Sequence, residues 1–192
     1  KIGLEHDEVK RIESLELNPG THIWHSRNIW LFSFYFAGVR ISDVMGMRWS
    51  DFKNGRLYYV MSKNDKPVTL KVPNKVENML RNYHDDKAFK DDYVFPYLKR
   101  ANPNNPEDIF IKCRSATHLV NRHLKRIAEM CDIDKNLSNH IARHTFGNIA
   151  GDRINPLMLQ KLYRHSDLKT TINYQSNFIH KDADDALETV IS

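Results

Sequence analysis

Four side chains that could act together on a phosphodiester gather near the C-terminus of this chain. His140 and Arg143 are three residues apart, His165 follows them, and Tyr174 lies nine residues after His165. An arginine fork can bind phosphate oxygens, a histidine can move protons near neutral pH, and a tyrosine can be a nucleophile. If these groups share one site, the chain would cut a nucleic acid through a covalent bond.

The same segment offers a second chemistry, because His140 and His144 have the spacing of a metal-binding pair. Residues four apart lie on one face of a helix, and two such histidines resemble the start of a zinc motif. The glutamate of a metalloprotease helix is missing, since Ile141 and Ala142 follow His140, and no third ligand is evident in the sequence. A surface histidine or a hydrogen-bonded core histidine is the alternative for each. We expect neither a metal nor another cofactor.

Two further candidates lie upstream. Arg40 is flanked by apolar helical residues, and a buried arginine must be paired. Asp43, three residues later, can hold it through a carboxylate contact; a simple structural pair is the alternative. Lys63 lies in a predicted hairpin turn, where a lysine is usually a solvated charge, and Lys66 competes with it for any role in chemistry.

The residue patterns predict that these side chains are positioned by a mostly helical chain with one small antiparallel sheet. Strands are expected at residues 56–61 and 68–72, and a third can form at 51–53. Residues 90–106 lack periodicity and are expected to form a loop. Helices are expected over residues 4–17, 21–38, 42–47, 74–84, 115–131, 138–152, 156–163, 168–174 and 180–191.

Length favours one compact domain, and the composition fits a polyanion partner, although many basic proteins bind no nucleic acid. The chain has 192 residues, 41% hydrophobic and 28% charged, and a net charge of +5, which suits a polyanion. No apolar run approaches the ~20 residues of a membrane span. Cys113 and Cys131 are too few for a disulfide framework, so reduced cytoplasmic thiols are expected. The first residue is not Met and no signal pattern follows, so we interpret the chain as a fragment.

Taken together, four segments resemble the tyrosine recombinases of the phage-integrase family. Residues 37–51 resemble the first arginine box of that family, and residues 63–68 its lysine turn. Residues 140–146 are similar to the His-x-x-Arg box, and residues 165–174 to the final box. The boxes occur in family order and cover nearly the whole chain. The aromatic-rich stretch before Arg40 further resembles integrases of mobile elements in Bacteroides-like bacteria.

The resemblance implies the tyrosine recombinase catalytic-domain fold and a type IB-like transesterification without metal. Tyr174 would attack the scissile phosphate and form a 3′-phosphotyrosyl link, with His140 exchanging its proton. A free tyrosine has a pKa of about 10, so it needs a base and a positive field. Lys63 would protonate the leaving 5′-oxygen as general acid. The 5′-hydroxyl of a partner strand would then reverse the reaction.

The resemblance also assigns the remaining site residues. Arg40 and Arg143 would bind the non-bridging oxygens and stabilise the charge of the transition state. His165 would hydrogen-bond the phosphate, and Asp43 would orient Arg40. His144 would be structural or would support Arg143.

On this resemblance, residues 1–192 are a catalytic domain without the N-terminal core-binding domain. The implied partners are double-stranded DNA, further protomers in a synaptic tetramer and accessory DNA-bending proteins, with no membrane, at the nucleoid in the bacterial cytoplasm. A type IB-like topoisomerase, a non-catalytic DNA-binding protein on the same fold and a zinc hydrolase are the alternatives. In the family, a last helix such as residues 182–191 packs on a neighbouring protomer; packing on its own domain is the alternative.

Two features remain open. The family usually has glycine before the histidine of the last box, where this chain has Tyr163 and Arg164. Arg164 adds bulk and charge beside His165, and Tyr163 does not match the position of the nucleophile. One predicted helix also carries basic residues that would contact the DNA backbone or simply face solvent: Arg122, His123, Lys125 and Arg126.

Overall fold

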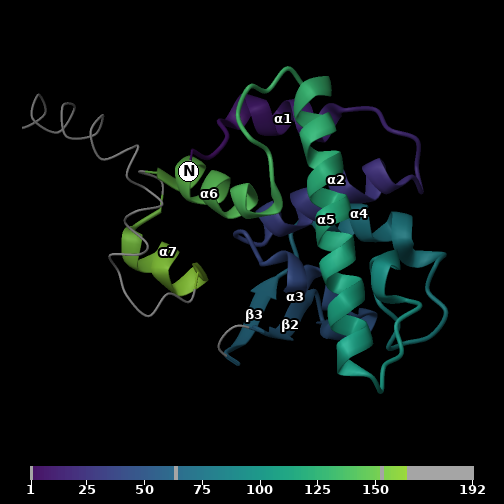
Figure 1. Ribbon diagram of the computed structural model, residues 1–192. Coiled ribbons are helices and arrows are strands. Elements are labelled where there is room, and N and C mark those ends of the chain that lie inside the picture. Colours follow the sequence, from purple (N-terminus) through teal and green to yellow (C-terminus); the bar gives the residue numbers. More distant parts are fainter. Residues whose placement is uncertain (1, 63–64, 152–153, 164–192) are drawn as a thin grey trace, which may run out of the picture.

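The computed structural model describes residues 2–62, 65–151 and 154–163, and these form a mostly helical fold with one small sheet (Figure 1). The predicted fold class is confirmed. Two short 3-10 helices lie at Trp49–Asp51 and Pro96–Leu98. The α-helices are α1 (His6–Ser14), α2 (His22–Tyr35), α3 (Ile41–Gly46), α4 (Asn74–His84), α5 (Pro106–Met130), α6 (Asn139–Ala150) and α7 (Pro156–Tyr163).

Helix α2 is the centre of the fold and packs against both α5 and α6 (Figure 1). It is apolar on nearly all sides, as expected of a helix that other helices surround. Ile29, Trp30 and Phe32 are fully buried, and each such side chain contributes about 1.5–3 kcal/mol when it leaves water. The Trp30 indole N–H also donates to the Ser138 carbonyl at 3.1 Å, directly before α6. The core thus fixes where α6 begins.

The sheet has three antiparallel strands in sequence order, β1 (Phe52–Lys53), β2 (Arg56–Val60) and β3 (Pro67–Lys71). Asn54 and Gly55 both have positive φ, as a two-residue hairpin turn requires. Tyr59 pairs with Val68, and the Met61 N–H donates to the Lys66 carbonyl beyond the strand ends. The hairpin and the third strand expected from the sequence are confirmed.

Helix α5 starts nine residues earlier than the sequence patterns predict. Asn105 caps it by accepting hydrogen bonds from the N–H groups of Glu107 and Asp108, and Pro106 occupies the first helical position. Proline suits that position, because a backbone N–H there would have no partner within the helix, so its absence costs no hydrogen bond. The prolines therefore mark a helix start as well as a loop.

The other boundaries agree more closely. Helix α1 is shorter than the expected 4–17, whereas α4 and α7 have the expected limits. The helices expected at residues 168–174 and 180–191 lie outside the described residues. Within the described ranges, no helix is both long enough and apolar enough to span a bilayer.

Candidate active site

Arg143 is the best-defined residue of the site. It lies on α6 with only 6% of its surface exposed. Its Nη1 donates to the Gly38 carbonyl at 3.2 Å and its Nη2 to the Tyr163 carbonyl at 2.7 Å. The guanidinium carbon lies 4.0 Å from the centre of the Tyr163 ring. Arg143 is therefore held between the turn after α2 and the end of α7, which lies beside α6 in Figure 1.

Gly38 allows the turn after α2 to approach Arg143 closely. Ala37 and Gly38 both have positive φ, 58° and 73°. A Cβ at Gly38 would lie 2.3 Å from the Cα of Arg143, closer than real atoms come. Only glycine combines that backbone conformation with that approach. The segment that leads to Arg40 is therefore in direct contact with α6.

Arg40 directly precedes α3, two residues after Gly38. Its side chain is half-buried, and its Nη1 is buried with no hydrogen-bond partner among the described residues. A buried unpaired donor costs free energy, and in native proteins it calls for an explanation such as a ligand. A phosphate oxygen is a group that this donor could bind.

Asp43 does not pair with Arg40, because no ion pair joins these two residues in the described part of the chain. Instead, Asp43 Oδ1 accepts hydrogen bonds from the Ser62 N–H at 3.1 Å and from the Ser62 hydroxyl. Asp43 is buried. The carboxylate thus connects α3 to the residue directly before Lys63, which itself lies outside the described residues. The sequence suggested a salt bridge, but the donors that this carboxylate meets come from the hairpin.

His140 and His144 lie one turn apart on α6. Their ring centroids are 4.8 Å apart and their planes nearly perpendicular. His140 is exposed and His144 half-buried. No group of three metal-binding side chains occurs among the residues that the structure describes. The structure thus places the His-x-x-Arg segment on one helix beside the Arg40 segment, whereas His165 and Tyr174 lie outside the described residues.

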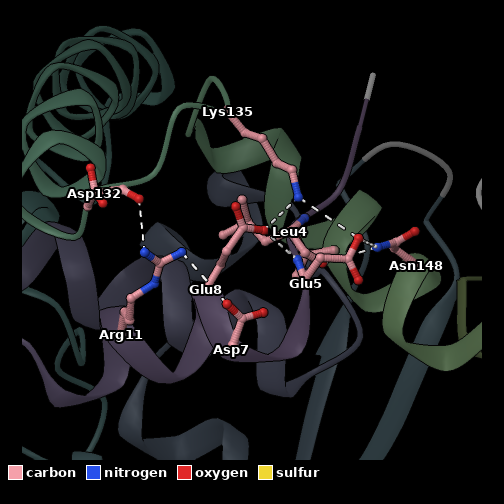
Figure 2. Close-up of polar contacts among 9 residues, drawn as sticks. Leu4, Glu5, Asp7, Glu8, Arg11, Asp132, Lys135 and Asn148 are labelled. Atoms are coloured by element: carbon pink, nitrogen blue, oxygen red, sulfur yellow. Dashed lines mark hydrogen bonds and ion pairs between the residues drawn. The ribbon is translucent and has the colours of Figure 1, made fainter.

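The N-terminal segment is hydrogen-bonded to α6, as the contact between Leu4 and Asn148 shows (Figure 2). The Leu4 N–H donates to Thr145 Oγ1 at 3.0 Å, and Asn148 Nδ2 donates to the Leu4 carbonyl at 3.2 Å. A Cβ at Gly3 would lie 2.6 Å from the His144 carbonyl oxygen. These contacts fix the peptide that follows His144. These contacts are not predicted from the sequence, where the signal for them is polar residues within a predicted amphipathic helix, such as Thr145 and Asn148.

A salt bridge extends this support to the loop before α6. Lys135 lies 2.7 Å from the carboxylate of Glu8 on α1 (Figure 2). Glu8 is buried, so this pair is less screened by solvent than a surface pair. The loop before α6 is therefore held by Glu8 of α1, and α6 itself is held by Leu4, which precedes α1.

Helix α5 presents an exposed basic face. Arg122 and Arg126 are exposed one turn apart, and Arg114 and His118 continue the four-residue spacing towards the start of the helix. None of the three arginines forms a salt bridge with a described residue. His123 differs, because it is half-buried and stacks on His22 with ring centroids 6.4 Å apart. Burial and the charge of Arg122 lower the pKa of His123, so it does not belong to the basic face.

The chain belongs to the phage integrase family, whose family model matches residues 3–180. A tyrosine recombinase of Pseudothermotoga lettingae is 28% identical over 147 residues, which are 73% of this chain and 46% of that protein. Tyrosine recombinase XerC of Myxococcus xanthus is 28% identical over 145 residues, again 73% of this chain and 46% of the relative. The predicted family is confirmed, and the chain spans about half the length of the curated relatives it matches.

Solved structures agree with the fold. XerH site-specific recombinase bound to palindromic difH substrate matches with a TM-score of 0.68 and 18% identity, covering 96% of this chain and 52% of XerH. The catalytic domain of bacteriophage HP1 integrase matches with a TM-score of 0.57 and 15% identity, covering 97% of this chain and 94% of that domain. At these identities the likeness shows a shared fold.

Proposed function

We propose that this chain is the catalytic domain of a site-specific DNA recombinase, which breaks and rejoins DNA strands through a 3′-phosphotyrosyl intermediate without a metal. One observation carries the proposal. Arg143 is buried and bonded to the carbonyl of Gly38, two residues before Arg40. The segment that carries Arg40 therefore contacts Arg143, which lies about a hundred residues further along the sequence, and this contact supports the binding of one phosphate by both arginines.

The arginines would stabilise the transition state. As the phosphorus becomes five-coordinate, charge grows on its non-bridging oxygens, and donors fixed beforehand stabilise it without reorganisation. The unpaired Nη1 of Arg40 and the restrained guanidinium of Arg143 suit this role. Each such donor contributes roughly 3–4 kcal/mol in comparable sites.

The proton transfers and the nucleophile are assigned from the family boxes. Tyr174 would attack the phosphorus, His140 would exchange the tyrosyl proton, and His165 would donate a hydrogen bond to the phosphate. Lys63 would protonate the 5′-oxygen. The contact from Asp43 to Ser62 supports this placement of Lys63, because it anchors the preceding residue to the helix that follows Arg40. Lys66 remains the alternative general acid.

The partners follow from charge and from the relatives. The exposed arginines of α5 would bind DNA phosphates. Similar structures are described as XerH bound to difH substrate and a lambda integrase dimer bound to a core site, which supports duplex DNA and further protomers as partners here. We propose that the chain acts on DNA at the nucleoid, as one domain of a longer protein.

A suicide DNA substrate, nicked beside the cleavage point, tests the proposal. The short downstream fragment, which carries the free 5′-hydroxyl, diffuses away after cleavage, so a covalent protein–DNA adduct should accumulate and remain on a denaturing gel. Tyr174→Phe should abolish the adduct, because it lacks the attacking oxygen. The neighbouring substitution Tyr163→Phe should retain it, because that hydroxyl is buried.

Three outcomes would contradict the assignment. An adduct formed by Tyr174→Phe would exclude Tyr174 as the nucleophile. Loss of the adduct on addition of a chelator would exclude metal-free chemistry. Relaxation of supercoiled DNA without any strand exchange between two recombination sites would favour a topoisomerase.

A further inference from the structure

Tyr163, the last described residue of α7, contacts Arg143 at both its backbone and its guanidinium. The phenol donates a hydrogen bond to the Arg143 carbonyl oxygen, and the Tyr163 carbonyl accepts from Nη2 at 2.7 Å. The guanidinium carbon lies 4.0 Å above the Tyr163 ring. Tyr163 therefore restrains both the backbone and the guanidinium of Arg143.

The Tyr163 hydroxyl is not placed to act on DNA. The residue is 1% exposed and lies in a small apolar cluster with Ala37, Ala150 and Leu159. Its hydroxyl is already engaged by the Arg143 carbonyl. A phosphodiester of duplex DNA could not reach this oxygen without the cluster opening. The contacts of Tyr163 with the site therefore run through Arg143.

We propose that Tyr163 is a positioning residue, which holds the guanidinium of Arg143 in the orientation that binds the scissile phosphate. The inference rests on the proposed function. An arginine side chain has many rotamers, and a donor fixed before the reaction stabilises a transition state better than one that must be ordered during it. The aromatic face attracts the cation from below. The Gly38 carbonyl restrains it from the side of the Arg40 segment.

The position of Tyr163 in the chain gives this contact a second effect. Tyr163 precedes His165 by two residues. Its hydrogen bonds with Arg143 of α6 therefore also fix the position of the backbone two residues before His165. The sequence departs from the usual family pattern at this point, where Arg164 replaces glycine. The tyrosine thus ties the His-x-x-Arg segment to the end of α7, two residues before the final box in the sequence.

A chemical substitution in the DNA separates a role through Arg143 from a role in stability. Replacing one non-bridging oxygen of the scissile phosphate by a methyl group removes the negative charge that Arg143 would stabilise. Arg143→Ala should then be slow on phosphate, but its deficit relative to the wild type should shrink on the methylphosphonate. Tyr163→Leu, which removes ring and hydroxyl, should behave in the same way.

The expected result is graded. On ordinary phosphate, Tyr163→Leu should slow adduct formation about 10- to 100-fold, because small displacements of a catalytic group have effects of that size. Tyr163→Phe keeps the ring and should slow it only about fivefold, the value of one neutral hydrogen bond. On methylphosphonate, the deficit of Tyr163→Leu should fall to about threefold or less. Gel-resolved adduct formation in single-turnover reactions measures all of these rates.

Tyr83→Leu is the matched control. Tyr83 is also 1% exposed and hydrogen-bonded, to His25 and Asn28, but it does not contact Arg143. Its variant should lose stability without any selective rescue by the methylphosphonate. An equal slowing of Tyr163→Leu on both substrates would overturn the inference. Tyr163→Phe provides the same comparison if the leucine variant does not fold, because it should show a smaller rescue in the same direction. Failure of the wild type to form any adduct would instead overturn the proposed function.

Discussion

A single glycine decides how closely the two arginine segments meet. Gly38 has a φ of 73°, and its carbonyl oxygen accepts from Arg143. Its missing side chain leaves room for the backbone of α6, since any Cβ would overlap the Cα of Arg143. The approach of the turn before Arg40 to α6 is therefore limited by direct contact with the backbone of α6.

Gly38→Ala should destabilise the fold by about 2–4 kcal/mol, from the positive φ together with the overlap. Gly20→Ala is the control, because Gly20 has a φ of 78° with nothing within 4 Å of a Cβ. It should cost only about 1 kcal/mol. Urea unfolding measures both. Equal losses for the two variants would mean that α6 can move away from the turn.

At the scale of elements, helix α5 has two different faces, one buried in the core and one basic and exposed. Its inner face supplies Val120 and Leu124 to the core. Its outer face carries arginines spaced by about one turn, so that they follow the same side. His123 lies between these faces and stacks on His22. An outer face of this kind can follow a DNA backbone without reading its sequence.

Replacing Arg122 and Arg126 by Gln should weaken DNA binding to a similar extent for all sequences. The slope of log K against log salt concentration should become shallower by about 0.9 for each phosphate that the variant no longer neutralises. Fluorescence anisotropy over a salt series measures that slope. Lys10→Gln removes one exposed charge from α1 and should leave the slope unchanged. An unchanged slope in the α5 variant would remove this helix from the DNA interface.

Much of the element order could be predicted because hydrophobic periodicity is local. Helix α4 has the expected limits, since its buried residues Val76, Met79, Leu80 and Tyr83 repeat with the helical period. The start of α5 was misjudged because Pro106 suits a loop and a first helical turn equally. The partners of buried polar groups were harder to predict. That Asp43 binds Ser62, and Arg143 binds Tyr163, depends on which elements meet in three dimensions.

At the scale of the whole molecule, a buried histidine makes stability depend on pH. His25 packs among Trp24, Tyr83 and Tyr97 and is hydrogen-bonded to the Tyr83 hydroxyl at 3.0 Å. Burial, with a smaller effect from the charge of His22, lowers the pKa of His25 to about 4, although Asp86 acts in the opposite direction. The folded protein therefore holds this imidazole neutral where the unfolded chain would protonate it.

The free energy of unfolding should therefore fall as the pH is lowered from about 6.5, where the unfolded histidine titrates, to about 4. The loss from this group should reach up to about 3 kcal/mol, because each pKa unit corresponds to about 1.4 kcal/mol. His25→Phe should flatten the profile in this interval. His6→Gln, at an exposed position, should not. Urea unfolding at several pH values measures the effect, and an unchanged slope in His25→Phe would assign it to other groups.

The bond between Leu4 and Thr145 also has a consequence for synthesis of the protein. The two residues are 141 positions apart, and a ribosome adds about 5–20 residues per second. Leu4 is thus made about 7–28 s before its partner. Helix α6 cannot pack against the segment that contains Leu4 until the residues between them have been made. The contact between Gly38 and Arg143 likewise forms only after residue 143 has been made, so the proposed phosphate site is assembled long after synthesis of the Arg40 segment.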